Sequence, residues 1–94
     1  MGYEAACNHL RDDVATVLLA LERPALATAS HAASATYHLT DALHHAAGDP
    51  NDARWGSALS SLARFLKECS RSPRATHTAA FASLERFLTE NAAA

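Results

Sequence analysis

Residues 48–69 read GDPNDARWGSALSSLARFLKEC, and they decide the fold because a helix boundary here precedes a clear amphipathic pattern. Gly48 suits the left-handed position that ends a helix. Asp49 and Pro50 suit the cap and the first turn of the next helix, with an acidic residue following in that turn. Beyond this boundary the apolar residues alternate steps of four and three, which predicts an amphipathic helix over 50–70. These residues are Trp55, Leu59, Leu62, Leu66 and Cys69.

Three further segments carry the same helical period. In residues 3–22 the apolar side chains, Tyr3 among them, also step by four and three. Pro24 disfavours helix at the residue before it and suits a first helical turn, so a second helix is expected over 24–47. A single kinked helix through Pro24 is the alternative. Ser72-Pro73 repeats the cap-plus-proline signal and predicts a last helix over 73–91.

The composition agrees with an all-α fold. The chain has 94 residues, of which 23 are alanine, the residue with the best helix propensity. It has two valines and no isoleucine, so the β-branched residues that favour strands are scarce. A chain of this length forms one domain that can bury a core without disulfides or metals. We therefore expect a single domain over 1–94, an antiparallel up-down-up-down four-helix bundle.

Charge and hydropathy disfavour two classes of partner. The formal net charge is −2 at pH 7, and no nucleic-acid-binding motif is present, so no nucleic acid is expected as a partner. The longest apolar run, Val17–Leu21, is far too short to span a bilayer. The first residues lack the basic segment of a signal peptide. We expect a cytoplasmic protein without a membrane partner.

Histidines form a stripe on the second predicted helix. His31, His38 and His45 are seven residues apart, and Asp41 lies between the last two. Positions seven apart lie about 10.5 Å apart along a helix axis, whereas a zinc ion holds its ligands at about 2.0–2.1 Å. Consecutive histidines therefore cannot share one ion, although Asp41 and His45 could contribute a pair. A solvent-facing polar stripe without metal or cofactor is the favoured interpretation, and a metal- or small-ligand-binding bundle is the alternative.

A histidine phosphotransfer-type domain is a third and weaker hypothesis. Such domains are four-helix bundles with an exposed acceptor histidine in mid-helix, and His31 would take that role. The residues after it are Ala32-Ala33-Ser34-Ala35, and the predicted helix carries no lysine or arginine. The cation that would steady the phosphate charge is therefore missing from this helix.

Basic residues gather late in the third predicted helix and just beyond it. Arg64, Lys67 and Arg71 lie on one side of this helix, opposite Trp55, and Arg74 follows. Four cations could bind an anionic partner, although such a run is more often a solvated face. We retain these residues as candidate interaction residues.

The two cysteines, Cys7 and Cys69, both fall on apolar stripes. Free cysteine is among the most buried residue types, and no Cys-x-x-Cys motif is present. In the expected topology the first and third helices are parallel, which places the thiols near opposite ends of the bundle, on the order of 20 Å apart. A disulfide needs Cα atoms within about 7 Å. We therefore expect two buried, reduced thiols.

One segment of the chain resembles another. Residues 61–68 and 83–90 are identical at six of eight positions, which include an arginine, Arg64 in one copy and Arg86 in the other. Helix duplication would produce such a match. The favoured interpretation is that two amphipathic helices drawn from one biased composition look alike.

These patterns predict a function by its class only. No catalytic constellation is recognisable, and the apolar arc of the second predicted helix is wide and built mostly from alanine. We therefore expect a non-enzymatic protein–protein interaction module: a regulatory, adaptor or chaperone-like bundle. Leu39 and Leu43 would stay partly exposed if one bundle cannot cover the whole arc, which would favour a homodimer.

Overall fold

The computed structural model describes residues 3–91, with side chains from Ala6 onward, so the side chain of Tyr3 lies outside the described part. Five helices follow one another, with no strand in residues 3–91. They are α1 (Tyr3–Ala20), α2 (Leu26–His45), α3 (Ala53–Cys69), α4 (Pro73–Thr76) and α5 (Ala79–Asn91).

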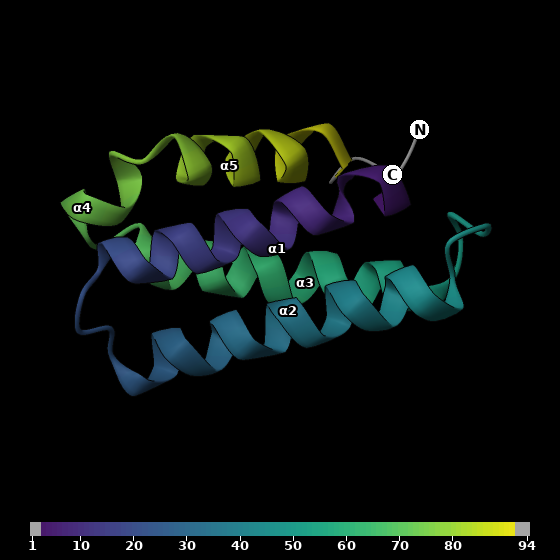
Figure 1. Ribbon diagram of the computed structural model, residues 1–94, viewed down its shortest axis with the longest axis horizontal. Coiled ribbons are helices and arrows are strands. Elements are labelled where there is room, and N and C mark those ends of the chain that lie inside the picture. Colours follow the sequence, from purple (N-terminus) through teal and green to yellow (C-terminus); the bar gives the residue numbers. More distant parts are fainter. Residues whose placement is uncertain (1–2, 92–94) are drawn as a thin grey trace.

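The four long helices form the predicted bundle. Figure 1 shows α1, α2, α3 and α5 lying along the long axis of the molecule, each reversing the direction of the one before. Helix α2 packs against both α1 and α3, and α5 closes the ring by packing against α1 and α3. The all-α, up-down-up-down architecture is thus confirmed. Within residues 3–91 no helix is long and apolar enough to cross a membrane.

The chain breaks around Pro24, so the kinked continuous helix is wrong. Helix α1 ends at Ala20 and α2 begins at Leu26, two residues inside each expected boundary. Glu22 lies in the left-handed region with φ 60°, which reverses the chain. Ala25, extended at φ −60° and ψ 153°, precedes the first turn of α2. Because proline disfavours helix at the residue before it, the break spreads over several residues.

The start of α3 also differs from the prediction. Asp52, not Asp49, is the N-cap, and its Oδ1 accepts a hydrogen bond of 2.9 Å from the backbone N–H of Arg54. Asp49 instead accepts from the backbone N–H of Asn51 at 2.9 Å and makes a local turn. Both aspartates can cap a helix. Because Asp49 and Pro50 belong to the turn, Asp52 becomes the N-cap of α3.

The last predicted helix, 73–91, is interrupted. Ser72 and Pro73 occupy the N-cap and first position of α4, as expected, but α4 ends after four residues. Thr78 then accepts a hydrogen bond of 3.0 Å at its Oγ1 from the backbone N–H of Phe81. This bond caps the first turn of α5, so Thr78 starts a new helix inside a segment whose apolar period looks continuous.

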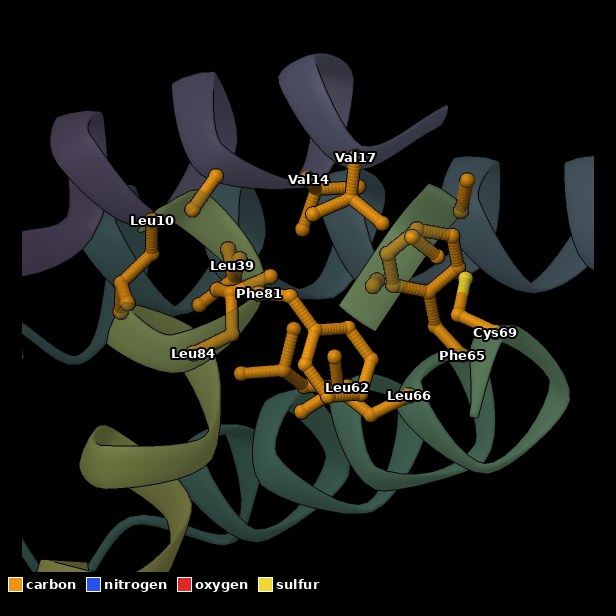
Figure 2. Close-up of a cluster of buried hydrophobic side chains, with 14 of the residues drawn as sticks. Leu10, Val14, Val17, Leu39, Leu62, Phe65, Leu66, Cys69, Phe81 and Leu84 are labelled. Atoms are coloured by element: carbon orange, nitrogen blue, oxygen red, sulfur yellow. The ribbon is translucent and has the colours of Figure 1, made fainter. Parts of the chain in front are cut away.

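The predicted apolar stripes supply the core. Figure 2 shows side chains from α1, α2, α3 and α5 meeting at the centre of the bundle. A second buried cluster at the α2–α3 turn contains Trp55 against Ala42 and Ala46. The labelled members of the main core are Leu10, Val14, Val17, Leu39, Leu62, Phe65, Leu66, Cys69, Phe81 and Leu84.

Both cysteines are buried free thiols, as predicted. Cys7 lies near the start of α1 and Cys69 ends α3, and these helices run in the same direction in Figure 1. The thiols therefore belong to opposite ends of the bundle. Cys7 Sγ donates a hydrogen bond of 3.1 Å to the carbonyl oxygen of Leu39. Burial raises the pKa of Cys7, a rise that the nearby Arg11 partly offsets.

Candidate functional site

The histidine stripe lies along the side of α2 that borders α3. His31 and His38 are half-buried, and His45 is exposed. Asp41 Oδ1 lies 3.8 Å from His45 Nε2, while Asp41 Oδ2 lies 3.5 Å from Arg54 Nε. An arginine therefore already neutralises the only carboxylate of the candidate metal site. Among the residues that the structure describes, no three His, Cys, Asp or Glu side chains are placed to hold a metal ion.

Two contacts fix the register between α2 and α3. Ser34 Oγ lies 3.4 Å from Ser61 Oγ, and the Oδ2 atom of Asp41 lies 3.5 Å from Arg54 Nε. The helices are antiparallel, so moving along α2 from Ser34 toward Asp41 moves back along α3 by the same number of residues. His38, which lies between these two contacts, is therefore level with Ser57.

A groove of about 530 Å³ opens along this boundary. It joins two features that are separate in the sequence, because His38 from the histidine stripe and Arg64 from the basic run line the same space. Ser57, Ser60 and Arg64 follow at helical spacing on one face of α3. The complete lining is His38, Ala53, Gly56, Ser57, Ser60, Ser61 and Arg64. We call it the α2–α3 groove.

The polar groups of the α2–α3 groove are largely unengaged. Hydroxyl groups elsewhere on α1 and α2 give a comparison. Thr16, Thr36 and Thr40 each donate a hydroxyl to the carbonyl four residues earlier, at 2.9–3.0 Å. In the described part of the chain, Ser57 and Ser60 make no such side-chain bond, and no carboxylate lies within 4.0 Å of the Arg64 guanidinium. Their hydrogen-bonding capacity is directed to solvent or to a ligand.

The remaining basic candidates lie on other parts of the surface. Lys67 lines a cleft between α3 and α5 that also contains Glu85. Arg71 lies two residues after the end of α3, beside the α1–α2 connection. Arg74 Nη1 makes a 2.6 Å ion pair with Glu22 Oε2. All four basic residues are exposed, but only Arg64 lines the α2–α3 groove.

Leu39 does not form an exposed patch, which corrects the expectation made for it. Only 2% of Leu39 is exposed, and it belongs to the main core; Leu43 is half-buried against that core. The reason is that α2 has two neighbours, α1 and α3. The part of the alanine-rich arc around Leu39 is therefore covered within one bundle, whereas Ala33 stays exposed.

The exposed apolar surface of α2 lies on its outer side instead. Leu26 is 88% exposed and Tyr37 is 66% exposed; on α1, Leu19 is 78% exposed. Leu26 and Tyr37 are eleven residues apart, which returns to within about 20° of the same direction on a helix. The positions between and after them step by four and three. We call this set the α2 outer stripe: Leu26, Ser30, Ala33, Tyr37, Thr40 and His44.

The α2 outer stripe carries no fixed charge. All its members are exposed except Thr40, which is half-buried and accepts a 2.9 Å hydrogen bond at its Oγ1 from Arg11 Nη1 of α1. The scarcity of charged residues in this part of the sequence could have predicted the stripe. Asp41 is the only Asp, Glu, Lys or Arg in the twenty residues of α2, although half the helix faces outward. A solvated helix face usually carries charges.

Comparison with known protein families, with curated proteins and with solved structures finds no match for this chain.

Proposed function

We propose that this chain is a small non-enzymatic protein–protein interaction module, of the regulatory, adaptor or chaperone-like kind, which associates with a second copy of itself. The exposure of Leu26 and Tyr37 on one uncharged helix face carries the proposal. Exposed apolar patches with a polar surround commonly mark interfaces.

The outer face of α5 shows what a solvated face of this chain looks like. Glu85, Arg86 and Glu90 are all exposed there and keep both signs of charge in water. The α2 outer stripe has alanine, serine, threonine and two large apolar side chains instead. Solvation alone does not account for that difference between two helices of one small domain.

A second copy fits the spacing of the α2 outer stripe. The six positions are symmetric about the middle of the helix, so two antiparallel copies of α2 would face each other residue for residue. Ala33 would lie opposite the second copy's Tyr37, which sets a small side chain against a large one. Ser30 would face Thr40, and Leu26 would face His44. Such a pairing is isologous and brings no like fixed charges together.

The size of the contact predicts a weak dimer. Helix α2 is twenty residues long, or about 30 Å. One helix face buries less than the roughly 800 Å² per partner of a standard interface. We therefore expect dissociation in the micromolar range or above.

Sedimentation velocity across micromolar to millimolar concentrations tests the proposal. The wild-type chain should shift from monomer to dimer as concentration rises. Ala33→Glu and Tyr37→Glu should each keep the chain monomeric, because each buries two carboxylates in the contact, against the second copy's Tyr37 or Ala33 and near each other across the symmetry axis. Ala82→Glu, at an exposed position of α5, is the matched control and should still dimerise. A wild-type monomer at every concentration, or equal behaviour of the three variants, would overturn the proposal.

A further inference from the structure

The α2–α3 groove and the α2 outer stripe share no residue. We propose that the α2–α3 groove is a binding site for a phosphate monoester group of a small molecule, held by Arg64, Ser57, Ser60 and His38, whether or not the chain dimerises. These four side chains come from two helices and line one space of about 530 Å³. The space is a shallow depression that is widely open to solvent, so it suits a small anionic group better than a large ligand.

The donor set of the groove suits a tetrahedral anion. The Arg64 guanidinium offers a fork of N–H groups that matches two phosphate oxygens at once. Ser60 and Ser57 offer hydroxyl donors about one and two helical turns before Arg64, on the same face of α3. His38 adds a ring N–H from the opposite helix. A phosphate oxygen accepts from each of these groups, whereas a cation would find few acceptors among them.

The charge around the α2–α3 groove favours an anion as well. None of the residues lining it is Asp or Glu. The nearest acidic residue along α2, Asp41, faces Arg54 at 3.5 Å and His45 at 3.8 Å. The Arg64 guanidinium, in contrast, meets no carboxylate within 4.0 Å among the described residues. The positive charge of Arg64 is therefore available to a ligand, and that of Arg54 is not.

Gly56 also lines the α2–α3 groove. Glycine within a helix costs about 0.5–1 kcal/mol relative to alanine. A Cβ at this position would meet no heavy atom of the described residues within 4 Å, apart from its chain neighbours and the nearby backbone of α3. Core packing therefore does not require this glycine. Its small size leaves room for a ligand to approach the backbone of α3.

The exposure of Arg64 sets the expected strength of binding. An exposed cation is screened by water and salt, so the site should bind a single phosphate group with millimolar affinity. Binding should weaken as sodium chloride is added. A small organic group attached to the phosphate would gain a little affinity by covering Gly56 and Ala53.

Titration of the ¹⁵N-labelled full chain with inorganic phosphate and with phenyl phosphate tests the site, with sodium chloride at equal ionic strength as the reference. Saturable amide shifts are expected at His38, Ser57, Ser60 and Arg64. Arg64→Gln should weaken binding about tenfold or more, and Ser57→Ala with Ser60→Ala should weaken it several-fold. Arg86→Gln is the matched control, because Arg86 is the counterpart of Arg64 in the similar segment of α5 and lies outside the groove.

The outcomes separate a site from a general effect of salt. Equal binding by Arg64→Gln and wild type would overturn the proposal, as would shifts that grow linearly and match those produced by chloride. Vesicles containing phosphatidic acid present the same group on a lipid. Binding to those vesicles without saturable binding of phenyl phosphate would overturn a small-molecule site. The amide spectrum of each variant also reports whether it is folded, so loss of binding is distinguished from loss of structure.

Discussion

Trp55 Nε1 donates a hydrogen bond of 2.9 Å to the carbonyl oxygen of Ala46 and thereby ties the start of α3 to the end of α2. The same oxygen accepts a second bond of 3.1 Å from the backbone N–H of Asp49. A helix end leaves carbonyl groups without intrahelical partners, and these two donors satisfy one of them. The turn between the helices is thus closed by an indole as well as by backbone.

Trp55→Phe removes the indole donor while keeping an aromatic ring in the buried cluster. The Ala46 carbonyl would still accept from Asp49, so we expect a loss of only about 1 kcal/mol in the free energy of unfolding. Trp55→Ala would also create a cavity and should cost about 3–5 kcal/mol. Urea unfolding of both variants measures the difference. Equal losses would mean that the hydrogen bond, not the packing of the ring, stabilises this turn.

Gly56→Ala should stabilise the protein. The open space above Gly56 accommodates a methyl group, and alanine has the higher helix propensity. The free energy of unfolding should rise by about 0.5–1 kcal/mol, measured by urea or thermal unfolding. A destabilised variant would show that this part of α3 has no room for a side chain.

The sequence predicted the α3 core face well because the pattern is strong and local. Leu62 and Leu66 lie in the core as their spacing required. The helix ends were harder to predict, because neighbouring residues compete to cap them. Asp49 and Asp52 are both good caps, and only the folded turn selects one. Thr78 falls inside the predicted last helix. Its capping bond to Phe81 forms only because the folded chain ends α4 just before it, which the local sequence does not reveal.

Helical periodicity alone could not predict which candidate residues lie together in the folded protein. His38 and Arg64 each stood out in the sequence, but their shared groove depends on the register that the Ser34–Ser61 contact records. That register is set by packing between helices and leaves no local signal. The prediction that Leu39 stays partly exposed was wrong for a related reason. Helical spacing identifies an apolar face, but not the number of neighbouring helices that cover it.

Thr78→Ala should destabilise the last helix. Thr78 Oγ1 accepts from the Phe81 N–H and donates to the Ala75 carbonyl, each at 3.0 Å. Loss of a threonine cap costs about 1 kcal/mol, and as much as about 2 kcal/mol in some proteins. Thr89→Ala is the control, because Thr89 is exposed and bonds only to a carbonyl of its own helix. Chemical unfolding should show a clear loss for Thr78→Ala and almost none for Thr89→Ala.

Cys69 should make the stability of the fold depend on alkaline pH. Burial, and to a smaller extent the charge of Glu68, raises the pKa of Cys69 from 9.0 to about 11. Below pH 9 the thiol is protonated in both the folded and the unfolded chain, so its contribution to stability is fully present. Between pH 9 and 11 the unfolded chain loses this proton first. Stability therefore falls as pH rises through this window, by about 3 kcal/mol in total.

The comparison with Cys69→Ala isolates this contribution from other groups that titrate at high pH. The variant should be less stable at neutral pH, because it loses a buried sulfur, but its free energy of unfolding should decline less steeply above pH 9. The native thiol should also react slowly with a disulfide reagent, since the thiolate is the reactive form and burial disfavours it. Parallel pH profiles for the two proteins would contradict the raised pKa. Fast labelling of Cys69 in the folded chain would instead mean that the end of α3 opens readily, because its sulfur is otherwise enclosed by the core.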